Sequence, residues 1–370
     1  MTDRMSAPGA PHAPDATDTP GTSDTPGTCA TRATASAPAA PVRDGIAPDE
    51  ARRESAARFA SVVDLIDSGQ LEFPLPGSGR TAARLAALRS VAEEDLCVAR
   101  LVEGHVDALA ILAELDGPAP MPGQRWGVWA AEPPNATLEA TPSGDGWVLS
   151  GLKPYCSGAR SCTHALVTAR TTEGRRLFAV AVDAARCVPV EGTWQALGMA
   201  GSDTPDVHFD RVPAVAVGDV ESYVQRPGFQ HGGIGVAACW LGGAIAVAHA
   251  LRRAAAQRSD PHTDAHLGAV DVQLHAARAV LDQAAAEIDA DPADSSGQAD
   301  VRGLRVRAFI ESVCSEVLTR VGRATGAGPL CHDLRHARDV ADLTVYVRQH
   351  HGERDLAHLG AVLARPQESR

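Results

Sequence analysis

The sequence contains no run of basic residues, and this lack excludes one large class of partner. Its 370 residues include 34 Lys and Arg against 46 Asp and Glu, which gives a formal net charge of -12. Nucleic-acid binding needs clustered Lys and Arg side chains that face the phosphates, so an acidic chain without such a cluster is a poor candidate for it. We therefore expect no nucleic-acid partner.

CxxC and HExxH motifs are also missing, which bears on redox state and on metals. The eight cysteines show no even framework, and a chain of this length can bury enough apolar surface to fold without disulfides. They fit a reducing cytoplasm, where we place the protein. Two pairs, His262 with His266 and His332 with His336, have the spacing that lets two ligands share a helix face, but no third ligand accompanies them. We therefore expect no metal site.

Large apolar side chains are almost absent from the first 47 residues, which are rich in Ala, Pro, Thr, Asp and Gly. Such a segment cannot offset the entropy that is lost when a backbone becomes ordered, so we expect a disordered tail over residues 1–47. No apolar stretch of sufficient length follows Arg4, and for this reason we do not expect a secretory signal.

One long stretch has no charged residue. Residues 232–251 read GGIGVAACWLGGAIAVAHAL, and 11 of these 20 residues are Gly or Ala. The length would allow a membrane span, but small residues contribute little apolar transfer energy. We therefore predict a buried helix of a bundle, whose small residues let neighbouring helices approach closely, and no membrane partner.

Apolar residues at helical spacing predict helices on both sides of the middle of the chain. In the first part, residues 50–68 and 80–114 carry such stripes, and the segment GQLEFPLPGSGR interrupts the pattern between them. In the last third, three more stripes fall within residues 266–290, 306–321 and 337–347. The polar segment DADPADSSGQAD between the first two of these is expected to be a loop.

Strands are predicted between these helical parts. Residues 144–146 form a hairpin turn signal, because Gly-Asp-Gly precedes an apolar run. Residues 165–170 and 177–182 are rich in strand-forming side chains and are joined by TTEGRR, which indicates a second hairpin. A last strand over residues 206–217 contains Pro213, and its missing N–H favours an edge or a bulge.

Three sequence segments of this middle block, which we call phrases, follow one another in the order that is typical of one family. They are GVWAAEPP from Gly127, LSGLKPYCSGA from Leu149 and WQALGMAGSDTPDVHFDRVPAV from Trp194. The chain resembles the flavin-dependent acyl-CoA dehydrogenase superfamily over roughly residues 60 to 362, as a divergent member. The resemblance implies an α+β fold with an N-terminal helical domain, a middle antiparallel β domain that covers the flavin ring, and a C-terminal four-helix bundle. We expect these domains at residues 48–120, 121–225 and 226–370. An unrelated α+β protein is the plain alternative.

The resemblance also implies where a flavin would be held. In the superfamily the first phrase lines the pyrimidine edge of the flavin, and the second places an aromatic ring against it with a hydroxyl nearby. The matching residues are Trp129 and Ala131, then Tyr155 and Ser157. Ala131 departs from the usual Thr or Ser, and one lost hydrogen bond costs about 1 kcal/mol. Each also has a plainer interpretation as a core or loop residue, and Asp203, usual in the superfamily, is equally explained as a turn residue that binds its own backbone.

FAD and a homodimer or homotetramer, with cofactor sites at subunit contacts, are further implications of the resemblance. Many relatives have an Arg early in the bundle that reaches the pyrophosphate of the cofactor, and Arg258 matches it. Here it precedes Ser-Asp-Pro instead of Phe and Gly, and the carboxylate of Asp260 has the wrong sign beside a phosphate. The usual Gln-containing glycine turn is reduced to ATGAGP around Gly326 and Gly328, which is also typical of a helix end.

The catalytic base of the superfamily has no counterpart in the sequence. Dehydrogenation of an acyl thioester needs a carboxylate that faces the flavin from the bundle. Counting the usual distance from Arg335 places Thr344 at this position, and a shifted count places Val347 there, but neither side chain accepts a proton. The alternative site at the start of the Gly-rich helix, residues 231–233, also lacks a carboxylate. The identity of any base is therefore unknown.

Other titratable residues near these positions are candidates for a substitute. Asp342, Glu353 and His231 lie nearest in the sequence, although polar residues on helices usually face solvent. His350 and His351 could face a flavin, as His does in related flavin monooxygenases. A solvated helix end with favourable cations explains this pair equally well.

Three hypotheses follow for the function. The first is an FAD-dependent oxidoreductase that acts on the CH-CH group of an acyl thioester, with acyl-CoA as substrate and an electron-transfer protein as partner. The second is a flavin-dependent monooxygenase of the same fold that receives reduced flavin from a separate reductase. The third is a non-catalytic homologue that binds acyl groups after its active site decayed, which Ala131 and Thr344 motivate.

Overall fold

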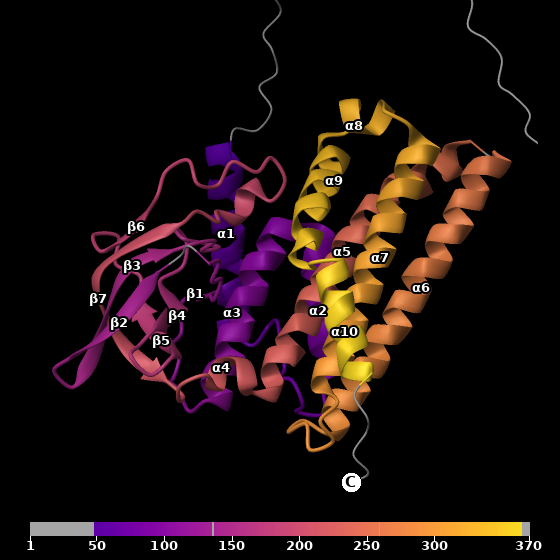
Figure 1. Ribbon diagram of the computed structural model, residues 1–370. Helices are drawn as coiled ribbons and strands as arrows, with labels where there is room; N and C mark the ends of the chain where they lie inside the picture. Colours follow the sequence, from indigo (N-terminus) through magenta and orange to yellow (C-terminus); the bar gives the residue numbers. More distant parts are fainter. Residues whose placement is uncertain (1–47, 135–136, 259, 365–370) are drawn as a thin grey trace, which may run out of the picture. The chain divides into compact units, whose positions relative to one another are not determined.

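Residues 48–134, 137–258 and 260–364 are described by a computed structural model of the protein (Figure 1). The predicted tail, residues 1–47, lies outside them. The early helices are α1 (Pro48–Asp67), α2 (Thr81–Glu94) and α3 (Leu96–Glu114). The strands are β1 (Trp126–Trp129), β2 (Leu138–Ser143), β3 (Gly146–Lys153), β4 (His164–Arg170), β5 (Arg175–Ala181), β6 (Cys187–Pro189) and β7 (Val207–Val217), with the short helix η1 (Ala200–Ser202) before β7. The later helices are α4 (Ser222–Gln225), α5 (Pro227–Gln257), α6 (Pro261–Ala290), α7 (Ala299–Thr325), α8 (Gly328–His332), α9 (Leu334–Tyr346), η2 (Val347–Gln349) and α10 (Glu353–Leu363). The predicted order of helices, strands and helices is confirmed.

The continuous helical pattern over residues 80–114 is divided into two helices by Asp95. Its backbone is extended, with φ of -162° and ψ of 114°, and its side chain accepts a hydrogen bond from the backbone N–H of Val98. Asp is among the residues that cap a helix N-terminus best, because its carboxylate satisfies an N–H that has no partner within the helix. The expectation of one helix was wrong because the apolar spacing continues across the cap.

The strands form one mixed sheet around a buried apolar interior. The predicted hairpins are confirmed as the antiparallel pairs of β2 with β3 and of β4 with β5. Pairing runs from β4 through β2, β3, β7 and β5 back to β4, which closes five strands into a ring. Two contacts are parallel, β1 with β4 and β2 with β4, so the sheet is mixed where the sequence led us to expect an antiparallel one.

Pro213 lies in the long strand β7, at a point where only one side of the strand is paired. On one side β7 pairs with β3, where Pro213 lies opposite Val148. On the other side β7 pairs with β6 at residues 207–209 and with β5 at residues 215–217, so Pro213 falls between the two partners. Its missing N–H therefore costs no ladder hydrogen bond on that side, as predicted.

Helix α5 is the centre of the helical region. It packs against α2, α3, α6, α7 and α9, and its small residues are what allow this (Figure 1). A Cβ at Gly243 would lie 3.0 Å from Leu96, and one at Gly242 would collide with the backbone of Arg89. The most apolar 18-residue window of this helix is 89% buried inside the fold, which agrees with a bundle helix, although its length and composition alone would suit a membrane span.

A predicted histidine pair is divided between the short helix α8, at the top of the bundle in Figure 1, and the longer helix α9. His332 is the last residue of α8, and His336 lies in α9 after the extended residue Asp333. The expectation that His332 and His336 share one helix face was therefore wrong, since Asp333 ends the first helix and caps the second. Within the described residues, no group of three or more His, Cys, Asp and Glu side chains is placed to hold a metal ion.

His105 joins α3 to the first strand in its neutral form. Its side chain is 2% exposed, and Nδ1 accepts a hydrogen bond of 3.2 Å from the backbone N–H of Trp126. Burial lowers the pKa of His105 to about 4, the nearby positive charge of Arg125 acts in the same direction, and Asp67 opposes both. A buried imidazole that accepts a hydrogen bond cannot take up a proton without losing that bond.

We expect the substitution His105→Asn to flatten the acid limb of the stability profile. Between pH 6.5 and about 4 the unfolded chain binds a proton at this residue and the folded chain does not, so wild-type stability falls as the pH falls. This residue accounts for about 3 kcal/mol of that loss, and the Asn oxygen can still accept from Trp126. Urea unfolding measured at pH 7 and pH 4.5 checks the difference. The exposed His208→Asn variant should follow the wild-type curve, and identical slopes for His105→Asn and wild type would contradict the assignment.

Candidate functional site

The loop between β3 and β4 carries Tyr155 and Ser157, and a second loop holds it in place. Backbone N–H groups of Cys156, Gly158 and Ala159 donate to the carbonyls of Pro205, Ser202 and Asp203, at 2.9, 2.9 and 3.2 Å. These three hydrogen bonds hold the loop against the segment that leads into β7. The second and third phrases of the sequence therefore meet in space, far apart as they are in the chain.

Ser157 is buried within a small hydroxyl network. Its Oγ accepts a hydrogen bond of 3.1 Å from Thr204, whose hydroxyl also contacts Ser202 at 2.8 Å. Ser157 is 8% exposed, and in the described part of the chain its own hydroxyl proton has no acceptor. One donor is thus left for another molecule.

Trp129 fixes the position of this loop through a hydrogen bond to its backbone. Its side chain is fully buried, with its ring edge against Phe209, and Nε1 donates to the backbone carbonyl of Ser157 at 2.9 Å. The structure thus brings Trp129 and Ser157 together, with the indole N–H already satisfied. Any contribution of Trp129 to a bound cofactor acts through the position of Ser157.

Tyr155 and Ala131 are more open. Tyr155 is 54% exposed in a left-handed backbone conformation with φ of 56°, and its N–H donates to Asp206 at 3.3 Å. An aromatic ring held out on a fixed backbone is available for stacking. Ala131 is half-buried after β1 and shares a small cleft with Glu132 and Lys153.

Asp203 binds a residue on another loop. Its carboxylate receives the side chain of Arg160 at 2.6 Å and the backbone N–H of Arg160 at 2.9 Å. It therefore links the two loops by a partly buried ion pair. The simpler interpretation, that Asp203 binds its own backbone, was wrong, because its partner lies 43 residues away in the sequence.

The carboxyl half of α9 packs directly on the loop before η1. Asp342 accepts a short hydrogen bond from the backbone N–H of Met199, and the Cys97 thiol lies 3.6 Å from its Oδ2. Burial raises the pKa of Asp342 to about 6. Because both oxygens already have partners, this carboxylate braces the helix against the loop and is poorly placed to serve as a free base.

The two positions expected for a base differ in exposure, and neither carries a group that can serve as a general base. Thr344 is exposed and donates its hydroxyl to the carbonyl of Val340 at 2.6 Å, one turn back in the same helix. Val347 is fully buried in the core. Neither residue presents a proton acceptor to a neighbouring cavity or loop.

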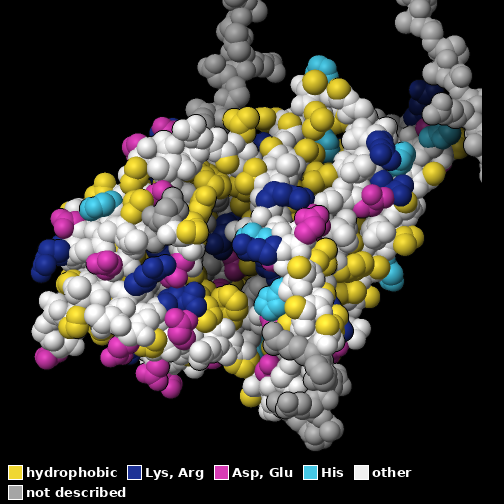
Figure 2. Space-filling model, viewed as in Figure 1, with side chains coloured by type: hydrophobic (Ala, Val, Ile, Leu, Met, Phe, Trp, Pro, Cys, Tyr) yellow, Lys and Arg dark blue, Asp and Glu magenta, His cyan; other side chains and the backbone are white. Residues whose placement is uncertain are grey.

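His350 and His351 lie in the turn before α10 and share one acid. His350 is 5% exposed and His351 is exposed, and their ring nitrogens lie 3.9 and 3.4 Å from Asp355. Burial lowers the pKa of His350. The interpretation as a solvated helix end was therefore wrong for His350. Figure 2 shows Arg side chains beside His over the region of α9 and α10.

A row of three charged side chains lies on the inner face of α3 and was missed by the sequence analysis. Arg100, Glu103 and Asp107 follow each other at spacings of three and four, which places them on one face. Arg100 and Glu103 form a close ion pair with side chains 15% and 6% exposed. Burial raises the pKa of Glu103, and Arg100 opposes this. We call these three residues the charged row.

Asp107 has no hydrogen bond or ion pair among the described residues. Its carboxylate faces the first turns of α5, since a Cβ added to Gly232 would lie 2.8 Å from Oδ1. From the other side its charge raises the pKa of Tyr223, a phenol that burial already perturbs in the same direction. The charge of Asp107 also opposes the lowering of the Arg84 pKa by burial, so a cation already lies within its electrostatic range. Its oxygens still have unused acceptor capacity for an amine.

Polar atoms without partners surround the charged row. Trp240 and Tyr346 meet edge to face, with ring centroids 6.3 Å apart. The Tyr346 hydroxyl, the Trp240 Nε1 and the Arg100 Nε are all buried and have no hydrogen-bond partner in the described ranges. Burial and then the charge of Glu103 raise the pKa of Tyr346. Unsatisfied buried donors cost about 1–3 kcal/mol each, so a polar ligand that reached these groups would relieve that cost.

The residues expected to reach a pyrophosphate lie at the far end of α5. Arg258 is exposed and ends that helix, and Asp260 caps the next one by accepting from Thr263 N at 3.1 Å. Gly326 follows α7 with φ of 64°, in the manner of an ordinary helix end. The structure does not bring these residues together with Tyr155 and Ser157 through any contact described within one chain.

Comparisons with known proteins give relatives of limited extent in sequence. No protein-family model matches the chain. An L-evernosamine nitrososynthase from a Micromonospora species is 32% identical over 182 residues, which is 44% of this chain and 42% of that protein. The chain thus matches less than half the length of this relative.

Solved structures match over nearly their whole length. TdsC from Paenibacillus sp. A11-2, in complex with FMN and indole, has a TM-score of 0.67 and 17% identity, covering 86% of this chain and 96% of that one. KijD3 in complex with FMN and dTDP-3-amino-2,3,6-trideoxy-4-keto-3-methyl-D-glucose has a TM-score of 0.63 and 21% identity, covering 90% and 96%. At these identities the likeness shows a shared fold.

Proposed function

The chain has the acyl-CoA dehydrogenase-like fold, and from this premise we propose that it is a flavin-dependent monooxygenase. It would receive reduced flavin from a separate reductase and oxygenate a small polar molecule. This replaces dehydrogenation of an acyl thioester as the leading hypothesis. The oligomeric state and the reductase remain predictions.

One observation carries the choice between the two reactions. Thr344 and Val347, the two positions for the base of a dehydrogenase, offer an exposed hydroxyl and a buried isopropyl group. A general base contributes about 10²- to 10⁴-fold to such a reaction, and Asp342 is engaged by Met199 and Cys97. Oxygenation by a reduced flavin does not need this carboxylate.

The residues around Ser157 fit a flavin. Tyr155 offers an exposed ring, and Ser157 offers a hydroxyl proton two residues later on a loop fixed by three backbone hydrogen bonds. Ala131 contributes no hydroxyl, but its backbone remains. A flavin held here supplies the oxygen-activating redox chemistry. We propose FMN in place of FAD, because Asp260 caps a helix beside Arg258 and Gly326 merely ends one.

The charged row argues for a polar substrate. An acyl tail needs an apolar channel, whereas α3 presents Arg100, Glu103 and Asp107 toward α5 and α9. Beside them, the Trp240 Nε1 and the Tyr346 hydroxyl lack hydrogen-bond partners among the described residues. Two carboxylates and several donors suit a molecule with an amine and hydroxyl or carbonyl groups. In our proposal Asp107 holds the amine, and Glu103 stays paired with Arg100.

The relatives support the same class of substrate. KijD3 was solved with FMN and an amino sugar linked to dTDP, and the Micromonospora relative is named as a nitrososynthase. We therefore propose oxygenation at the nitrogen of an amine. TdsC, solved with FMN and indole, shows that the fold also accepts an aromatic molecule without a basic amine.

The test uses reduced FMN, a separate flavin reductase and ¹⁸O₂ with the dTDP-linked 3-amino sugar as probe. We expect incorporation of labelled oxygen in the product by mass spectrometry. The Asp107→Asn variant should raise KM for the amine about tenfold or more, because it removes a charge-assisted contact. The affinity of this variant for FMN should stay unchanged, because Asp107 is not among the residues proposed to hold the flavin.

Asp271→Asn is the matched control, since Asp271 is exposed on α6 and remote from the charged row. Dye reduction that depends on acyl-CoA, without oxygen incorporation, would favour the dehydrogenase. A protein that neither binds FMN in an absorbance titration nor turns over would leave the non-catalytic homologue as the better description.

A further inference from the structure

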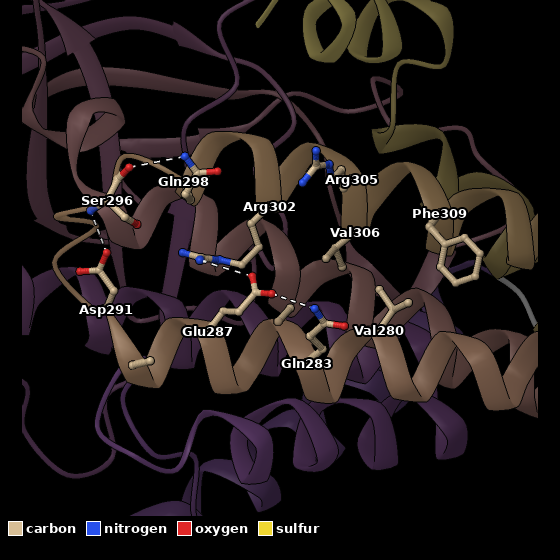
Figure 3. Close-up of a pocket in the computed structure, with 12 residues that line it drawn as sticks. Val280, Gln283, Glu287, Asp291, Ser296, Gln298, Arg302, Arg305, Val306 and Phe309 are labelled. Atoms are coloured by element: carbon tan, nitrogen blue, oxygen red, sulfur yellow. Dashed lines mark hydrogen bonds and ion pairs between the residues drawn. The ribbon is translucent and has the colours of Figure 1, made fainter. Parts of the chain in front are cut away.

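A pocket of about 600 Å³ lies between α6 and α7, and its walls share no residue with the loops around Ser157 or with the charged row (Figure 3). It is closed at one end by the connection from Asp291 to Gln298. A pocket of this size suits a small organic molecule. The function proposed above does not require it.

Arg302 is the central feature of this pocket. Its side chain is 7% exposed, and Figure 3 shows it directed from α7 toward α6. Within the described residues, Nε and one terminal nitrogen have no hydrogen-bond partner, while the other terminal nitrogen lies 3.7 Å from Glu287 Oε2. An unsatisfied buried guanidinium is costly, so these N–H groups are donors that an anion could accept from.

Two arginines and two acids line this pocket, so their charges balance, but the unused hydrogen-bond donors belong to the arginines. Arg305 is exposed, lines the same pocket one turn further along α7, and has no ion pair among the residues described. Glu287 is the acid that faces Arg302, and it also accepts from Gln283 at 3.0 Å. Asp291 is engaged by the backbone N–H groups of the connection, at 2.8 and 2.9 Å. Asp291 has its oxygens engaged and Glu287 is shared between Gln283 and Arg302, so the unused hydrogen-bonding capacity at this end of the pocket is that of Arg302, with Arg305 further along the helix.

The far end of the pocket is apolar. Val280 from α6 and Val306 and Phe309 from α7 lie beyond the two arginines in Figure 3, and Phe309 presents its ring to the opening. A molecule that fills both ends needs one negative charge and an apolar body. Inorganic phosphate would meet only the arginines, and a second negative charge would meet Glu287.

We propose that this pocket binds a small organic monoanion, with its carboxylate on Arg302, its ring or chain against Val306 and Phe309, and Arg305 at the rim as a second positive charge. The bidentate geometry of a guanidinium matches a carboxylate, and the apolar wall favours an aromatic or branched body. The ligand class is therefore an aromatic or aliphatic monocarboxylate.

The experiment titrates the full-length protein calorimetrically with 2-naphthoate, and with 2-naphthamide as the uncharged comparison. We expect saturable binding of the acid with Kd below about 1 mM and much weaker binding of the amide. Arg302→Gln should weaken the acid about tenfold or more, and Arg305→Gln by a smaller factor. Glu287→Gln should tighten it, because it removes a like charge.

Arg323→Gln is the matched control, an exposed arginine near the end of the same helix and outside the pocket. Arg305 and Glu287 are exposed, so Arg305→Gln and Glu287→Gln should fold. They therefore test the proposal even if Arg302→Gln does not fold. Equal binding of acid and amide, or no change in either of these two variants, would overturn the proposal. Neither result bears on flavin binding, which is measured separately.

Discussion

The substitution Glu103→Gln is expected to lower the free energy of unfolding by about 3–5 kcal/mol, the cost of leaving a buried partner charge uncompensated. Glu103 and Arg100 are 6% and 15% exposed, so solvent screens their attraction little. Arg100 Nε already lacks a partner, and loss of the carboxylate would leave most of the guanidinium without one. Urea unfolding followed by circular dichroism measures the change, with the slope checked for two-state behaviour.

A double variant separates the charge from the packing. Replacing both partners, Arg100→Met with Glu103→Leu, removes two desolvated charges together and should return stability to within about 1–2 kcal/mol of wild type. Glu316→Gln is the control, because Glu316 pairs with Arg320 one helical turn away and both side chains are half-exposed, so it should cost less than about 0.5 kcal/mol. Equal effects of Glu103→Gln and Glu316→Gln would show that the charged row is not desolvated.

The function predicts a second consequence for the same double variant. If the charged row lines the substrate site, the stable double variant should fold and bind FMN normally, but its KM for a polar amine should rise even though Asp107 is retained. A purely structural role would leave activity intact once stability is restored. The comparison therefore distinguishes a binding site from a buried structural pair.

Much of the fold could be predicted because local patterns and tertiary packing agree. The stripes within residues 266–290 and 306–321 became α6 and α7, and the Gly-Asp-Gly turn became the β2–β3 hairpin. The small-residue helix over residues 232–251 became the packed centre of the bundle. In each case the face that the pattern marks as apolar is the face that is buried.

The site was harder to predict because its important contacts are not local. Arg160 and Asp203 pair across 43 residues, and Asp342 reaches Met199 across 143. Spacing along one helix gives no sign of such contacts. The charged row did leave a signal, since Arg100, Glu103 and Asp107 stand in phase with the buried face of α3. A search limited to known motif positions passes over charges in that phase.

The largest effect on the assembled site is expected from Gly198→Ala. Gly198 is buried, and an added methyl group would collide with the carbonyl of Ala341 and approach Val345 Cγ2 to 2.9 Å. A backbone carbonyl within α9 cannot rotate away, so the helix or the loop must shift. Either movement breaks the bond from Met199 N–H to Asp342 and leaves a buried acid unpaired.

We expect Gly198→Ala to cost about 3 kcal/mol or more, from overpacking together with the lost hydrogen bond. Because the loop from Met199 to Pro205 also fixes the backbone around Ser157, FMN affinity should fall as well, even at a temperature where circular dichroism shows the variant folded. Gly322→Ala is the control: its Cβ would meet nothing within 4 Å on an exposed face of α7, and it should stabilise the helix by about 0.5–1 kcal/mol. An unchanged urea midpoint and unchanged FMN affinity in Gly198→Ala would mean that α9 does not brace the loop around Ser157, and would contradict the proposed flavin site.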